Sequence, residues 1–100
     1  MFHSINAYTG ETLCRRPAQS YAEFAQELAA LRVRRQAFAR LGVTGRTALL
    51  QAFAERLAQN KERLAEMVCE EVGRCLHECR AELDKSVELI RYYVRLAPEL

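Results

Sequence analysis

The chain has 100 residues, of which 50% are hydrophobic and 28% are charged, and this length excludes more than one globular domain. Its net charge of +2 argues against a nucleic-acid-binding or membrane-surface protein. No stretch approaches the roughly 20 consecutive apolar residues that span a bilayer, and the first six residues lack the basic and apolar regions of a signal peptide. We therefore expect a cytoplasmic protein with no nucleic-acid and no membrane partner.

The composition favours helices. Alanine, leucine, glutamate and arginine dominate, and only four glycines and two prolines interrupt the chain. A chain of this length can bury roughly two-thirds of its unfolded surface, so a modest core is expected. Four cysteines in a helix-rich chain without a signal peptide indicate reduced thiols rather than a disulfide framework.

Residues 1–16 are predicted to form a β-hairpin. Residues 2–6 and 11–15 have the composition of short strands, and Ala7–Gly10 between them is typical of a turn, with Gly10 at a positive φ. A two-stranded hairpin is marginally stable alone in water, so this one is expected to pack against another element.

The first helix is predicted over residues 20–41. Ser20 and Glu23 have the spacing of a capping box, in which each side chain accepts a hydrogen bond from the other residue's backbone N–H. Its arginines are spread around the helix rather than gathered on one face, which favours a solvated surface over a nucleic-acid interface. The apolar residues of its predicted buried stripe are Tyr21, Phe24, Leu28, Leu31 and Phe38.

The second helix is predicted over residues 45–72. The sequence between Gly42 and Gly45 breaks the helical pattern, and Thr44 is the expected N-cap. Asn60 permits a bend near the middle, although nothing in the sequence requires one. The predicted core face consists of Leu49, Leu50, Phe53, Leu57, Leu64, Met67 and Val68.

The third helix is predicted over residues 75–97, after a stop at Gly73 and before Pro98. Its apolar face follows a seven-residue repeat, which consists of Leu76, Leu83 and Ile90 with Val87 and Val94 beside them. The predicted fold class is therefore mainly α, with a short N-terminal hairpin followed by three amphipathic helices. Such helices can shield one another as a small bundle, or pack under a sheet that this chain does not contain. The sequence leaves both arrangements open.

Three cysteines and a histidine near Gly73 form the one cluster that resembles a metal site. These residues are Cys69, Cys75, His77 and Cys79. On one helix Cys75 and Cys79 lie about 40° apart, but His77 lies about 200° round from Cys75. Tight C-x2-C pairs, which are typical of zinc sites, do not occur. We therefore expect no metal site, and interpret the cysteines as buried or half-buried thiols.

A catalytic cysteine requires a depressed pKa and a positioned base. Cys75 has Arg74 beside it and stands at a helix start, but His77, the nearby candidate base, is on the wrong face. We therefore assign no catalytic residue in the chain.

Several short motifs occur in one order along the chain and together resemble the N-terminal segment of the aldehyde dehydrogenase superfamily. They are Ile5–Glu11, similar to I/V-N-P-x-T-G-E; Ala37-Phe38 followed by Arg46 and Leu49-Leu50, similar to W…R…L-L; Glu71–Arg74, similar to E-T/M-G-K; Glu78–Leu83, similar to E-A-R-x-E-V; and Arg91–Tyr93, similar to a Y-Y-A ending. The sequence of the third helix most resembles succinate-semialdehyde dehydrogenases. The resemblance covers nearly all 100 residues in register.

The chain departs from the family pattern at positions that are structural in the family. Ala7 replaces a proline, Phe38 replaces a tryptophan, and Arg74 replaces a lysine, while glycines stand where a Ser-Pro-x-Glu helix start is common. These departures suggest a divergent member rather than a new chemistry.

The resemblance implies a fold, a parent activity and a partner. It implies the N-terminal part of an α/β coenzyme domain, in an enzyme that uses NAD or NADP to oxidise an aldehyde, with succinate semialdehyde as one candidate substrate. The family's nucleophilic cysteine, general-base glutamate and coenzyme site all lie outside the matching segment. The resemblance thus gives this chain no catalytic, cofactor-binding or metal residue. We expect one partial domain, inactive alone, whose partner is the remainder of the parent enzyme.

An alternative from a different class stays open. The exposed apolar stripe also fits a stand-alone helical module for protein interaction or self-association. A third hypothesis is a small zinc-binding regulator, but the cysteine spacing gives it little support.

Overall fold

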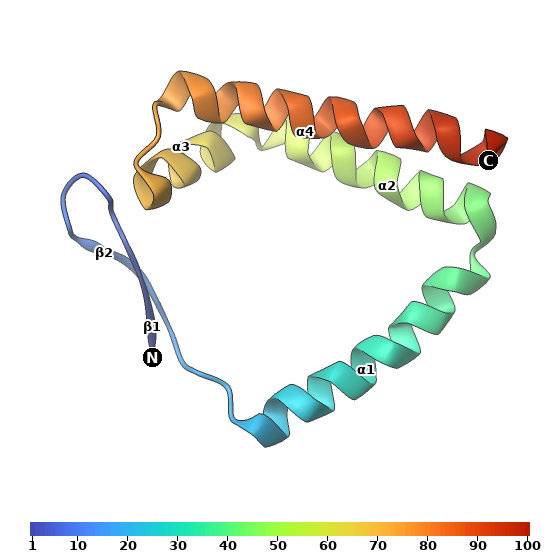
Figure 1. Ribbon diagram of the computed structural model, residues 1–100, viewed down its shortest axis with the longest axis horizontal. Coiled ribbons are helices and arrows are strands. Elements are labelled where there is room, and N and C mark those ends of the chain that lie inside the picture. Colours follow the sequence, from blue (N-terminus) through green and yellow to red (C-terminus); the bar gives the residue numbers. More distant parts are fainter.

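Residues 1–100 are described by a computed structural model, in which a hairpin and four α-helices follow one another around an open ring (Figure 1). The elements are β1 (Phe2–Ile5), β2 (Thr12–Arg16), α1 (Tyr21–Arg40), α2 (Gly42–Gln59), α3 (Lys61–Val72), α4 (Leu76–Leu96) and a short 3₁₀ turn (Ala97–Glu99). The mainly α fold with an N-terminal hairpin is confirmed, but four helices occur where three were predicted.

The hairpin is closed by side-chain and backbone bonds within its turn. β1 and β2 are antiparallel, with Ser4 opposite Cys14 and a bulge between Ser4 and Ile5. The Asn6 side-chain oxygen accepts from the backbone N–H groups of Tyr8 (2.9 Å) and Thr9 (3.1 Å). This arrangement is a turn in which the Asn side chain substitutes for a backbone acceptor. Gly10 has the expected positive φ of 75°.

Helix α1 begins at the predicted capping box and then packs against almost nothing. The Ser20 hydroxyl accepts from the Glu23 backbone N–H (3.2 Å), and the Glu23 carboxylate accepts from the Ser20 N–H (2.7 Å). No residue of α1 is buried, and the helix meets the rest of the chain mainly at α2. Its predicted stripe is therefore exposed.

The prediction of one helix over residues 45–72 is wrong in two respects. The helix begins earlier, at Gly42, whose φ of +67° produces the turn from α1, so Thr44 lies inside the helix and is not its N-cap. It also divides at Asn60 into α2 and α3. The Asn60 amide donates to the Arg56 carbonyl (2.8 Å), a local side-chain bond that competes with regular helix hydrogen bonding.

The buried part of the molecule lies where α4 packs on α2 and α3 (Figure 1). Only four residues are buried, namely Ala54, Ala65, Cys79 and Val87. The two alanines are fully buried, and small side chains at such positions let helix axes approach closely. The modest core expected from chain length is therefore smaller than predicted.

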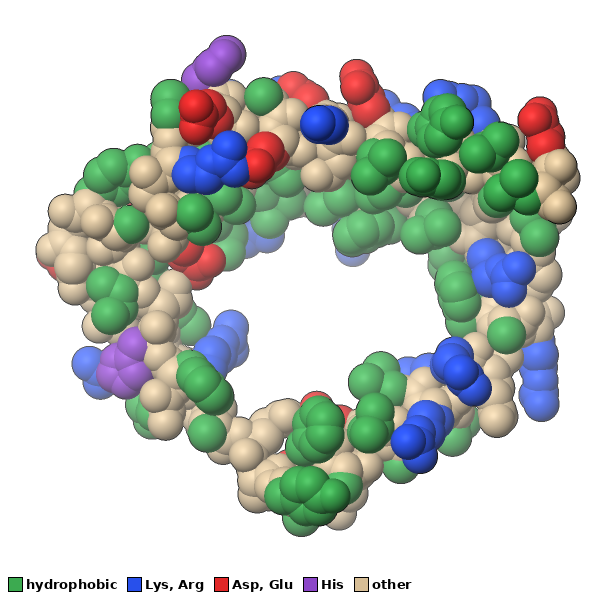
Figure 2. Space-filling model, in the orientation of Figure 1, with side chains coloured by type: hydrophobic (Ala, Val, Ile, Leu, Met, Phe, Trp, Pro, Cys, Tyr) green, Lys and Arg blue, Asp and Glu red, His purple; other side chains and the backbone are tan.

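The overall dimensions exclude a compact three-helix bundle. The radius of gyration is 17.5 Å, whereas a compact domain of 100 residues has about 13 Å. Figure 2 shows the ring open through its centre, with hydrophobic side chains gathered along the inner edge over α2 and α4. Exposed large apolar side chains include Phe24, Leu28, Leu31, Phe38, Leu49, Leu50, Phe53 and Met67. Of the two arrangements that the sequence left open, a self-contained bundle is absent.

Gly73→Ala should destabilise the chain, because Gly73 has φ +76° and an added Cβ would lie 3.0 Å from the Ala7 Cβ. A left-handed conformation costs a non-glycine residue about 1–2 kcal/mol, and the crowding against Ala7 adds to it. Urea unfolding measures the loss. Gly42→Ala is the matched control, since Gly42 has a similar φ and open space around it. Equal losses in both variants would show that the contact with Ala7 has no effect.

The N-terminal end of α1 should loosen in acid. The backbone N–H and hydroxyl of Ser20 hold the pKa of Glu23 below its usual value. The capping interaction is therefore fully present above the ordinary pKa of about 4.3 and is lost as pH falls through the lowered folded value. Amide hydrogen exchange at Ser20, measured against pH, should speed up across this window relative to other amides. Glu23→Gln, which stays neutral, should remove that pH dependence; an unchanged profile would contradict the assignment.

Candidate functional site

At the turn between α3 and α4, the N-terminal hairpin contacts polar and sulfur-bearing groups of residues that are distant in sequence. Gly73 takes the left-handed conformation expected at a helix end, and its N–H donates to the Cys69 carbonyl (2.9 Å). Helix α4 then begins at Leu76, with Cys75 in the N-cap position and no side-chain cap. The predicted stop at Gly73 is confirmed.

The hairpin is anchored to this turn by three contacts from residues far away in sequence. The Ala7 N–H donates to the Glu70 carbonyl (2.7 Å), and the Ser4 hydroxyl donates to the Glu71 carboxylate (2.6 Å). The Tyr8 hydroxyl donates to the Arg74 carbonyl oxygen (3.0 Å). These bonds meet the expectation that the hairpin needs another element for support.

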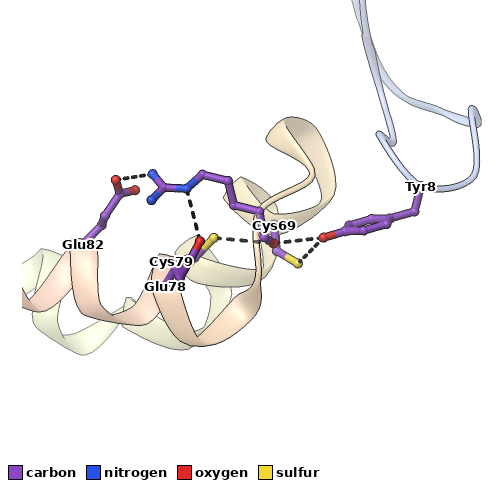
Figure 3. Close-up of polar contacts among 6 residues, drawn as sticks. Tyr8, Cys69, Glu78, Cys79 and Glu82 are labelled. Carbon is purple, nitrogen blue, oxygen red and sulfur yellow. Dashed lines mark hydrogen bonds and ion pairs between the residues drawn. The ribbon is translucent and has the colours of Figure 1, made fainter.

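The Tyr8 hydroxyl also lies among the cysteines of the turn (Figure 3). It is 3.8 Å from the Cys69 sulfur, and the Cys79 sulfur is 4.0 Å from the same Arg74 carbonyl that Tyr8 contacts. The hydrogen bond with Cys69 raises the pKa of Tyr8, and desolvation and the neighbouring thiol charges act in the same direction. Tyr8 thus remains a protonated donor at neutral pH.

The thiols near the turn differ in exposure. Cys69 is half-buried, Cys75 is exposed, and Cys79 is buried with 1% of its surface accessible. Burial raises the pKa of the Cys79 thiol, and the opposing effect of the Arg74 charge is smaller. A raised pKa is the reverse of what a nucleophilic cysteine needs.

The Arg74 guanidinium is directed to carboxylates of α4. It forms an ion pair with Glu82 and a longer one with Glu78 (3.7 Å). The hydrogen bond to Glu82 is the largest contribution that raises the pKa of Arg74, followed by the charge of Glu82. All three side chains are exposed, so these pairs orient the turn rather than contribute much stability.

The structure brings together part of the cluster that the sequence singled out. The Cys69 sulfur contacts the Tyr8 hydroxyl and the Cys79 sulfur contacts the Arg74 carbonyl, whereas His77 is exposed on α4 and takes no part in these contacts. No group of three or more His, Cys, Asp or Glu side chains has the arrangement of a metal site. The role of Tyr8 could not be predicted from the sequence, because its partner Arg74 lies 66 residues away and no local pattern pairs them.

The residues present do not fit a dinucleotide coenzyme. A dinucleotide fold needs parallel strands and a glycine-rich turn from strand to helix, but the single sheet here is an antiparallel pair. One hollow, of about 470 Å³, is lined by residues of α1 alone and is open to solvent. None of the helices has the length and apolarity required to cross a bilayer.

Comparison with known proteins gives one consistent result. Residues 1–100 match the aldehyde dehydrogenase family. Malonate-semialdehyde dehydrogenase from Listeria monocytogenes is 32% identical over 88 residues, which are 88% of this chain and 18% of that protein. The NADP(+) succinate-semialdehyde dehydrogenase from Deinococcus radiodurans is 30% identical over 100 residues, covering 97% of this chain and 20% of that protein.

A solved structure shows the same fold. Glyceraldehyde-3-phosphate dehydrogenase from Methanocaldococcus jannaschii, complexed with NADP, superposes with a TM-score of 0.88 at 22% identity, covering 96% of this chain and 21% of that one. The chain therefore spans about one fifth of the length of these proteins.

Tyr8→Phe should loosen the hairpin from the α3–α4 turn, because it removes the hydrogen bond to the Arg74 carbonyl. The expected result is faster hydrogen exchange of the Ala7 amide, which donates to Glu70 across the same contact. Tyr21→Phe is the control, since Tyr21 is 86% exposed. Unchanged Ala7 exchange in Tyr8→Phe would show that the hydroxyl does not anchor the hairpin.

Proposed function

Because this chain belongs to the aldehyde dehydrogenase family, we propose that its 100 residues are the N-terminal scaffold segment of a dehydrogenase that oxidises a semialdehyde with NAD or NADP. In this proposal the segment performs no chemical step. It braces a catalytic and coenzyme-binding body, and it is inactive without that body.

The observation that carries the proposal is the amount of surface left exposed. A compact monomer of this mass, 11.5 kDa, exposes about 5,800 Å², whereas the chain exposes 8,099 Å². The excess is about 2,300 Å². A standard protein–protein interface buries only about 800 Å² on each partner. An excess this large fits packing inside one folded body better than a contact between two separate molecules.

The distribution of the exposed apolar residues supports the same reading. On α2, Leu49, Leu50 and Phe53 are all at least 40% exposed, although the sequence predicts them for a core face. On α1, Phe24 and Leu31 are more than half exposed. An open ring with an apolar inner edge (Figure 2) can wrap around other structure without a core of its own.

A semialdehyde is the proposed substrate class because relatives along most of this chain are named malonate- and succinate-semialdehyde dehydrogenases. The exposed helix faces hold no enclosed polar pocket that could select between these acids. The choice of substrate, and of NAD or NADP, is therefore assigned to the body that the ring supports.

The isolated chain should neither bind NADP in calorimetry nor oxidise malonate or succinate semialdehyde. In sedimentation it should associate progressively with concentration, because its apolar faces have no defined partner. Saturable NADP binding would contradict the proposal. A stable, monodisperse dimer would favour the alternative function, a self-association module.

A chimera tests the scaffold role directly. This chain replaces the matching segment of the Deinococcus radiodurans enzyme, and the expected product is soluble and active with succinate semialdehyde, while the enzyme lacking the segment is not. Phe53→Asp in the chimera should abolish soluble enzyme, because it buries an unpaired charge. Arg56→Asp, an exposed charged position on the same helix, is the control and should be tolerated. Equal tolerance of both substitutions would show that the Phe53 face covers nothing.

A further inference from the structure

The α3–α4 turn places two cysteines symmetrically about its centre. Cys69 lies in the last turn of α3 and Cys79 in the first turn of α4, each five residues from Arg74. The helices that carry them are packed against each other. Since only residues 73–75 connect the two helices, positions equally far from the turn come to lie near one another.

Three short contacts connect the two sulfur atoms (Figure 3). The Cys69 sulfur is 3.8 Å from the Tyr8 hydroxyl, the hydroxyl is 3.0 Å from the Arg74 carbonyl oxygen, and that oxygen is 4.0 Å from the Cys79 sulfur. Both thiols are free. The hydroxyl and the carbonyl thus hold two reduced cysteines on either side of one small polar centre.

We propose that Cys69 and Cys79 are a thiol modification site, at which a hydroperoxide forms a reversible disulfide across the α3–α4 turn. The inference goes beyond the scaffold role and does not depend on it. It rests on the placement of the two sulfurs beside the Tyr8 hydroxyl and the Arg74 carbonyl.

The different exposure of the two thiols sets the order of events. Cys69 is half-buried and can meet a small oxidant from solvent, whereas Cys79 is shielded. With hydrogen peroxide, the Cys69 thiol gives up its proton as its sulfur attacks one peroxide oxygen, the O–O bond breaks, and the leaving hydroxide takes that proton, so that Cys69 sulfenic acid and water form. The Cys79 sulfur then attacks the Cys69 sulfur, an S–S bond forms, and a second water leaves. Two thiols lose two electrons and two protons, and one peroxide becomes two waters.

The cross-link changes how the hairpin is held. A disulfide joins its two residues at a Cα separation of about 4.4–6.8 Å, so the ends of α3 and α4 become fixed to each other. The Cys69 sulfur also turns from the Tyr8 hydroxyl toward Cys79. Tyr8 then keeps only the Arg74 carbonyl as its partner.

The test is peroxide treatment of the chain, followed by alkylation of the remaining thiols and peptide mapping. The expected product has lost two hydrogen atoms and contains the Cys69–Cys79 link, and dithiothreitol reverses the change. Cys75→Ser should leave the link intact, whereas Cys69→Ser should abolish it.

The same treatment in urea separates folded geometry from sequence proximity. In an unfolded chain no packing holds Cys69 beside Cys79, so links among Cys69, Cys75 and Cys79 should form there as a mixture. A Cys69–Cys79 link that dominates only under native conditions supports the proposal. The same mixture of links in both conditions, a dominant native link through Cys75, or no native link at all would overturn it.

Discussion

The packing of α4 against α2 and α3 is the interaction on which the rest of the ring depends. All four buried residues, Ala54, Ala65, Cys79 and Val87, lie on these three helices. The fully buried alanines allow close approach of the helices but remove little apolar surface from water, so this contact stabilises only its own neighbourhood. The hairpin is attached to it through the α3–α4 turn, and α1 extends from the start of α2. A chain organised in this way holds its elements in order while leaving most apolar side chains without a partner.

That lack of internal packing connects the fold to the proposed role. A segment that carries its own chemistry must hold several groups rigidly at a site, but here the hairpin and α1 form two arms joined to a single packed region. Cys79 has the wrong acidity for a catalytic nucleophile, since burial raises the pKa of its thiol. The arrangement can instead present apolar helix faces to a larger body. The chain belongs to the aldehyde dehydrogenase family and spans about one fifth of the length of its relatives.

Local signals made much of the fold predictable, while long-range contacts could not be read from the sequence. The capping box of Ser20 and Glu23 and the positive φ of Gly73 are properties of a few neighbouring residues, and both were predicted correctly. The break at Asn60 was not required by any pattern, and the hydrogen bond from its amide to the Arg56 carbonyl is visible only in the structure. The contact between Tyr8 and the turn joins segments about 66 residues apart. Apolar periodicity identified one-sided helices, but it does not indicate whether the partner lies inside or outside the chain.

Amide hydrogen exchange along α1 in the isolated chain tests the central claim most directly. If the ring needs an external body, α1 has no buried residue to protect it and its amides should exchange almost as fast as those of an unfolded peptide. Amides of α2 and α4 where the two helices pack should exchange more slowly. Protection of α1 equal to that of α4, in a chain that sediments as a monomer, would show that the molecule is complete in itself and would contradict the account.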